Sequence, residues 1–191
     1  MAVKKKQDLE VLLCYDSKEK DTSYVKDVLD KKINKDGIKI SESLRTTCKP
    51  LGCRISTADI TIMYKIKDSK DEWIPTNFAI ERKCGMDLFS SLYTASNRDR
   101  LFLELDRCKE ANLQFIFVST DSIEDIMKGI NNIPKFKNTN AEVTFFENFM
   151  KLQEKLNELG FLYVTTGKNG FAFTVRRLIK RFIVKNKLQY K

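Results

Sequence analysis

The stretch over residues 78–88, Phe-Ala-Ile-Glu-Arg-Lys-Cys-Gly-Met-Asp-Leu, constrains the fold more than any other part of this chain. An apolar β-type run ends in three charged residues, and a glycine and an aspartate then open a helical pattern, which predicts a strand, a turn and a helix. Because side chains alternate along a strand, Glu81 and Lys83 fall on one face and Arg82 on the other. A carboxylate and an ammonium group at one place suit a metal ion and a water molecule. The same pattern also fits an exposed strand with one local ion pair.

A second carboxylate precedes this strand. Asp59 lies in an alternating run over residues 57–64, and turn-forming residues 67–71 separate that run from the Glu81 strand. Two such runs joined by a turn predict a hairpin. The hairpin would place Asp59 beside Glu81, and paired carboxylates with water and carbonyl ligands suit Mg²⁺ or Mn²⁺.

The composition limits the chemistry. The chain has no histidine, which excludes Ser-His-Asp and Cys-His nucleophilic catalysis and any imidazole-ligated metal. Its 35 basic and 26 acidic residues give a net charge of +9, which favours a polyanionic partner. Metal-assisted hydrolysis of a phosphodiester bond fits the carboxylates, the lysine and the positive charge together.

Length and cysteine usage indicate one intracellular domain. We expect a single domain over residues 1–191, with a basic tail at residues 1–8. The sequence shows no signal peptide and no apolar run near the ~20 residues of a membrane helix. Five cysteines without a C-x-x-C pair favour reduced thiols. The expected compartment is the cytoplasm or nucleoid of a prokaryotic or viral host, or the nucleus of a eukaryote.

Short apolar runs alternate with helical patterns, which predicts an α/β fold. The expected strands cover residues 9–14, 57–64, 78–83, 113–118 and 161–165. The expected helices cover residues 23–35, 121–130, 141–159 and 172–185, with two more after Asp87 that separate near residues 95–97. Thr139–Glu142 fits a capping box, and Gly160 fits a helix stop. The apolar stripe that begins at Phe145 fits core packing better than an interface.

The residues named so far resemble the XPF-type nuclease domain (excision-repair cross-complementing group four) of the PD-(D/E)XK restriction-like superfamily. That pattern runs Gly-Asp, a variable gap, and then Glu-Arg-Lys-x-x-x-Asp-Leu. Here Asp59, the run Glu81–Lys83 and the pair Asp87–Leu88 match it, and Ala58 replaces the glycine.

The resemblance extends in both directions. Upstream, residues 14–19 are similar to the family's opening Asp-x-Arg-Glu, although Lys18 replaces the arginine; downstream, residues 100–102 are similar to its arginine-leucine helix. The resemblance implies a supporting group around the site, composed of Asp16, Glu19, Arg82, Asp87 and Arg100. Asp16 and Glu19 also fit turn residues, and Asp87 also fits a helix cap.

The resemblance implies a restriction-endonuclease-like core, with a central mixed sheet flanked by helices. It also implies a Mg²⁺- or Mn²⁺-dependent DNA endonuclease for branched or junction DNA in repair, recombination or replication, and a homodimer. Asp59 and Glu81 would hold the metal and Lys83 would position water. Family enzymes usually add a helix-hairpin-helix module, for which we expect no room here. Two alternatives stay open: a non-catalytic DNA-binding or scaffold subunit of an XPF-like heterodimer, and an unrelated basic protein with chance matches.

The positive charge is concentrated near the carboxyl end. After Glu158 no acidic residue follows, whereas eight basic residues do. On the expected helix over residues 172–185, one face carries a basic group that we predict to contact the DNA backbone, namely Arg176, Arg177, Lys180 and Arg181. A solvated helix face, or one covered by a partner subunit, fits the same pattern.

Overall fold

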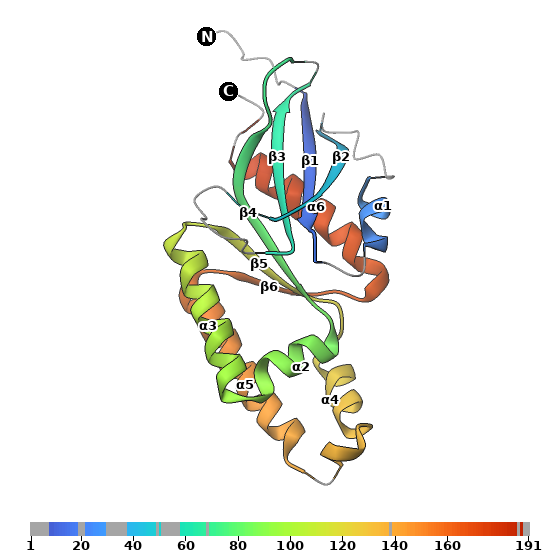
Figure 1. The fold of residues 1–191 in the computed structure, drawn as a ribbon, viewed down its shortest axis with the longest axis vertical. Helices are drawn as coiled ribbons and strands as arrows, with labels where there is room; N and C mark the ends of the chain where they lie inside the picture. Colours follow the sequence, from blue (N-terminus) through green and yellow to red (C-terminus); the bar gives the residue numbers. More distant parts are fainter. Residues whose placement is uncertain are drawn as a thin grey trace. The chain divides into compact units, whose positions relative to one another are not determined.

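The computed structural model describes residues 8–18, 22–29, 38–48, 50, 58–67, 69–137, 139–186 and 188, apart from the side chains of Lys39 and Ser41 (Figure 1). The strands form one six-stranded sheet in the order β2-β1-β3-β4-β5-β6. Their bounds are β1 (Leu9–Asp16), β2 (Ile38–Thr46), β3 (Ile60–Ile66), β4 (Ile74–Lys83), β5 (Gln114–Ser119) and β6 (Leu162–Thr165). The chain divides into two compact units, which are unit 1 (Met1–Ala79 and Gly170–Lys191) and unit 2 (Ile80–Asn169). Strand β4 therefore contributes residues to both units.

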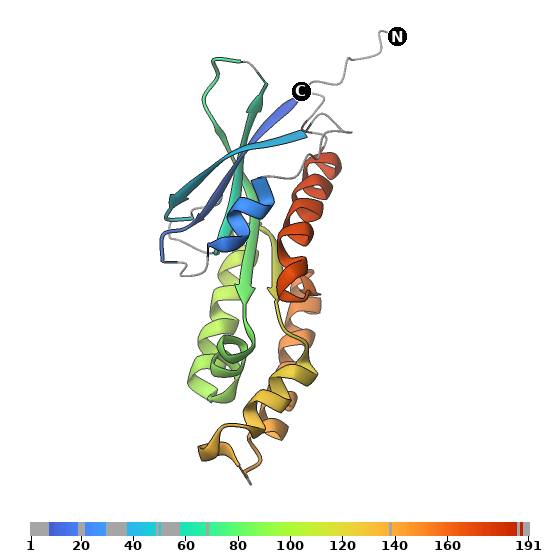
Figure 2. The same cartoon turned by 90° about the vertical axis from the view of Figure 1, so that its right-hand side faces the viewer.

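Unit 1 is built on β1, which pairs in parallel with β2 and antiparallel with β3. The apolar run of β1 is buried because both of its neighbours are strands, and Leu12 and Cys14 pack with Cys48 against Met63 and Trp73. Helices α1 (Ser23–Leu29) and α6 (Phe171–Lys185) lie side by side (Figure 2), and the rings of Tyr24 and Phe171 meet edge to face at 4.9 Å. The rings of Phe78 and Phe182 lie 5.1 Å apart and attach α6 to β4.

Unit 2 combines the end of β4 with β5 and β6, which pair in parallel. Its helices are α2 (Gly85–Tyr93), α3 (Ala95–Glu110), α4 (Ile123–Asn131) and α5 (Ala141–Leu159). The buried amide of Asn148 on α5 donates to the carbonyl of Leu92 at 2.9 Å and accepts from Arg98 Nη1 at 2.9 Å. This one side chain therefore fixes α5 against the turn between α2 and α3.

The predicted α/β fold with a mixed sheet flanked by helices is confirmed, since the sheet contains both parallel and antiparallel pairs. Gly160 ends α5 in the left-handed conformation (φ 72°), as predicted. The capping box is wrong, because Asn140 is the N-cap and makes no side-chain cap bond, while Glu142 accepts from Asn131 at 2.6 Å. The break between α2 and α3 lies at Thr94, just before the expected position.

Two predictions on organisation remain predictions. The single domain over residues 1–191 is one, and the basic tail is the other, since residues 1–7 lie outside the described part of the chain. Within the described residues, no helix combines the length and apolar character needed to cross a membrane.

Candidate active site

The charged end of β4 carries a close ion pair. Lys83 Nζ lies 2.7 Å from Glu81 Oε1, and the two side chains are 22% and 19% exposed. Alternation along the strand places both on one face, as their spacing predicts. Lys83 is the last residue of β4, and its carbonyl accepts a hydrogen bond from the Thr120 N–H at 3.0 Å, which holds the end of β4 beside the end of β5.

Asp59 lies in unit 1, one residue before β3 begins at Ile60, so the strand starts later than predicted. Its carbonyl oxygen accepts from the N–H of Asp16, the last residue of β1, at 2.8 Å. The antiparallel pairing of β1 and β3 thus brings the backbones of these two acids together, and both side chains are half-buried.

A buried thiol supports this backbone contact. The Cys48 Sγ donates to the carbonyl of Asp59 at 3.4 Å and to that of Cys14 at 3.5 Å. Burial raises the pKa of the Cys48 thiol far above its usual range and raises the pKa of Cys14 to about 11. Both thiols therefore stay protonated at neutral pH, so that Cys48 can act as a donor to the backbone of Asp59.

The supporting residues lie in different settings. The Asp16 carboxylate accepts from the N–H of Lys18 at 3.2 Å, as a turn residue does. Asp87 is not the N-cap of α2, which is Cys84; its carboxylate accepts from the Cys84 thiol at 2.9 Å. Arg82 is half-buried on β4, Arg100 is exposed on α3, and Glu19 lies outside the described residues.

The predicted basic face of α6 needs one correction. Arg177 and Arg181 are exposed and Lys180 is half-buried, but Arg176 is buried, with only 8% of its surface exposed. Arg176 lies at the edge of the buried arc of the helix. The Arg177 guanidinium lies over the ring of Phe173 at 5.6 Å, so an exposed aromatic side chain accompanies the exposed charge.

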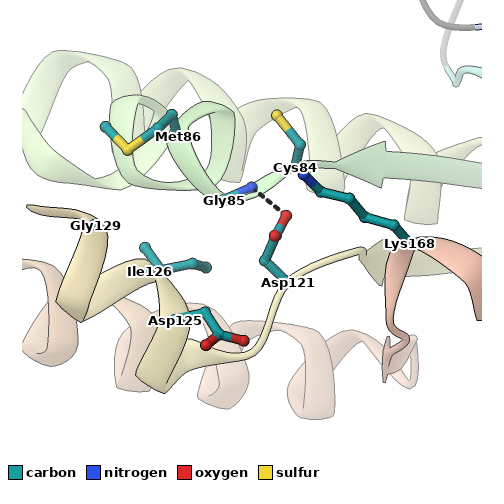
Figure 3. A pocket seen from close by; sticks show the side chains of 8 residues that line it. All are labelled: Cys84, Gly85, Met86, Asp121, Asp125, Ile126, Gly129 and Lys168. Carbon is teal, nitrogen blue, oxygen red and sulfur yellow. Dashed lines mark hydrogen bonds between the residues drawn. The ribbon is translucent and has the colours of Figure 1, made fainter.

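A cavity of about 230 Å³ in unit 2 was not foreseen from the sequence (Figure 3). Asp121, which follows β5, lines this cavity. Its Oδ2 accepts hydrogen bonds from the N–H of Gly85 at 2.8 Å and from the Thr120 hydroxyl at 3.1 Å. A polar run, Ser-Thr-Asp-Ser, directly after a buried strand was the available signal, because ligands of α/β folds gather beyond the carboxyl ends of strands.

Comparison with known proteins gives one informative likeness. No family model matches the chain, and no curated protein sequence matches it. A solved structure of XPF from Aeropyrum pernix, in complex with DNA, is similar with a TM-score of 0.50 and 15% sequence identity. The likeness is one of fold. The similar region covers 92% of this chain and 66% of that chain, so this chain spans slightly less than two thirds of the neighbour.

Proposed function

We propose that the chain is an intracellular metal-dependent DNA endonuclease that hydrolyses phosphodiester bonds in branched or junction DNA. The observation that carries this proposal is the half-buried ion pair of Glu81 and Lys83 at the end of β4, in a fold similar to that of XPF bound to DNA. A carboxylate and an ammonium group at one strand end are the groups that phosphodiester hydrolysis requires beside a second acid. Asp59 is that second acid in the proposal.

The residues fit a hard divalent ion. Asp59 and Glu81 offer carboxylate oxygens only, which Mg²⁺ and Mn²⁺ prefer, and Mg²⁺ commonly binds through one or two carboxylates with water completing its shell. Among the residues that the structure describes, no group of three histidine, cysteine or acidic side chains could hold a metal ion, and the proposal rests on two carboxylates with water. A divalent ion bound there would neutralise charge on the scissile phosphate and make water a better nucleophile.

The residues of the chain supply orientation. The Lys83 ammonium can donate a hydrogen bond to an attacking water and stabilise the negative charge that develops on the phosphate oxygens. Its ion pair with Glu81 holds both groups at the same strand face before substrate arrives, so little reorganisation is needed. In this proposal Asp16, Glu19, Arg82, Asp87 and Arg100 act as supporting groups, and Arg177, Lys180 and Arg181 contact the DNA backbone.

A cleavage panel tests this function. Labelled duplex, flap, fork and four-way junction are incubated with Mg²⁺, Mn²⁺ or EDTA, and wild-type protein is expected to cut at least one branched substrate with metal and none with EDTA. Asp59→Asn, Glu81→Gln and Lys83→Ala should each lower the cleavage rate by about 10²-fold or more while DNA binding persists. Glu104→Gln and Lys151→Ala remove comparable charges from exposed positions on α3 and α5 and serve as matched controls.

The panel also separates the alternatives. DNA binding without any metal-dependent cleavage would favour a non-catalytic DNA-binding or scaffold subunit. Full activity in any of the three site variants would remove that residue from its assigned role.

We also propose a homodimer. Helix α5 exposes three apolar side chains at spacings of three and four, Val143, Phe146 and Met150, which are 52%, 45% and 45% exposed. Such a stripe on a helix face fits a second helix. The predicted core stripe at Phe145 is a separate face of the same helix and is buried.

A further inference from the structure

The cavity in unit 2 lies where three strands end. Cys84 and Gly85 follow β4, Asp121 follows β5 and Lys168 follows β6, and all four line it (Figure 3). Two backbone hydrogen bonds hold the strand ends together. The N–H of Thr120 donates to the carbonyl of Lys83 at 3.0 Å, and the N–H of Thr166 donates to the carbonyl of Ser119 at 2.8 Å. Open α/β sheets bind ligands at this edge.

The polar groups of the cavity have unused capacity. Asp121 Oδ2 and Asp125 Oδ2 accept hydrogen bonds, the latter from Ser122 at 2.7 Å, but neither Oδ1 oxygen accepts one from a residue that the structure describes. Lys168 is exposed, has no carboxylate partner among the described residues, and extends toward the turn at Cys84 (Figure 3). The cavity therefore offers acceptors on its wall and a cation at its rim.

The charges of the cavity favour a ligand with hydrogen-bond donors over a bare phosphate. Two carboxylates repel a phosphate from the interior. Apolar groups of Met86 and Ile126 form the rest of the wall. A flat, neutral group with N–H donors along one edge fits this lining, because its edge can donate to a carboxylate and its faces can pack against the apolar side chains.

Gly129 keeps the cavity open. It lies inside α4 without a positive φ, and a Cβ added there would meet only Met86 Sδ, at 4.0 Å. A helix is less stable with glycine at an interior position than with alanine. At position 129 neither the backbone conformation nor a close neighbour requires glycine. The missing side chain leaves room that a larger residue would fill.

We propose that this cavity binds one unpaired guanine of a DNA strand, with its N1–H and N2–H₂ donating to a wall carboxylate and its phosphate paired with Lys168. The volume is below the roughly 300–1,000 Å³ of sites for drug-sized ligands and suits a single base. Unpaired bases are read through their Watson–Crick edge between apolar side chains. Cys84, which lines the cavity, directly follows Lys83 in the chain, so the base would lie next to the proposed reaction site. The inference rests on the proposed function, because DNA is the ligand.

Binding of forked DNA tests the proposal. Fork arms of thymine, with or without one guanine at each position in turn, are compared by fluorescence anisotropy in EDTA. Guanine at one position should tighten binding about 10-fold, the discrimination of a good two-bond base contact. Gly129→Leu should abolish that gain, leave thymine forks bound as before and leave the urea midpoint unchanged or raised, because leucine is also a better helix former than glycine. Lys168→Gln should weaken the gain.

Gly129→Ala is the matched control, because its single methyl group has room beside Met86 and should stabilise α4 while keeping most of the gain. Equal affinity for guanine and thymine arms, or a gain that survives Gly129→Leu, would overturn the proposal. If thymine forks are bound and cut but guanine adds nothing, only this inference fails. If no fork is bound, the proposed function fails with it.

Discussion

Cys84 offers a test at the scale of one residue. Burial and then the hydrogen bond to Asp87 raise the pKa of the Cys84 thiol above its ordinary value, so less of it is thiolate at pH 8 than for an unperturbed cysteine. Its alkylation by iodoacetamide, followed by peptide mass spectrometry, should be slow at pH 8 and rise through higher pH. Asp87→Asn removes the negative charge and should speed alkylation at pH 8 several-fold. Cys48, fully buried, should stay unreactive in both proteins; slower labelling of the Asp87 variant would refute this account.

Arg176 offers a second test. Its Nη1 is buried and makes no hydrogen bond to any residue that the structure describes. Arg176→Met should leave the free energy of unfolding unchanged or raise it by about 1–3 kcal/mol, because a buried donor without a partner carries a desolvation cost of that size. Urea unfolding measures this. Affinity for DNA should not change, whereas a large drop would return Arg176 to the DNA-binding face.

Sequence reasoning at this scale succeeded where a local rule applied. Alternation placed Glu81 and Lys83 on one strand face, and Gly160 was recognised as a helix stop. It failed where contacts with distant segments determine the environment of a residue. The burial of Arg176 depends on packing around the helix, and the contact of Asp121 with Gly85 joins positions 36 residues apart.

At the scale of the element, α6 carries the proposed contact with the DNA backbone. Changing Arg177, Lys180 and Arg181 to alanine should weaken binding similarly on all sequences, because phosphate contacts carry no sequence information. The plot of log affinity against log salt should flatten by roughly one unit per lost contact. Lys128→Ala with Lys151→Ala removes exposed charges from unit 2 as a control. An unchanged salt slope would assign α6 to subunit packing instead.

Most elements could be predicted because apolar period and length distinguish strands from helices. Boundaries depend on neighbours: β3 starts at Ile60 because its pairing with β1 ends at Tyr15, and the N–H of Asp16 bonds to Asp59 beyond it. The capping box at Thr139 failed because Glu142 has a better donor in Asn131, a residue on another helix.

At the scale of the whole molecule, the homodimer is testable. Light scattering at micromolar concentration should give twice the 22.2 kDa mass of one chain. Phe146→Glu places a charge in the exposed stripe of α5 and should shift the mass toward one chain, since burying an unpaired charge in an interface is costly. Ile74→Glu, at an exposed apolar residue in unit 1, is the matched control. A single-chain mass for wild-type protein would refute the dimer.

Unit 1 is discontinuous, since residues 80–169 of unit 2 interrupt it. During synthesis unit 2 is complete as soon as residue 169 has emerged, while Tyr24 and Phe78 still lack Phe171 and Phe182, which follow it in the chain. Domains tend to fold as units once their chain is available, so we expect the amino-terminal strands to finish folding after the middle of the chain. Asp59, which belongs to unit 1, would then reach its final surroundings only after α6 has been synthesised, so a stalled chain that stops short of α6 would have unit 2 folded and unit 1 incomplete.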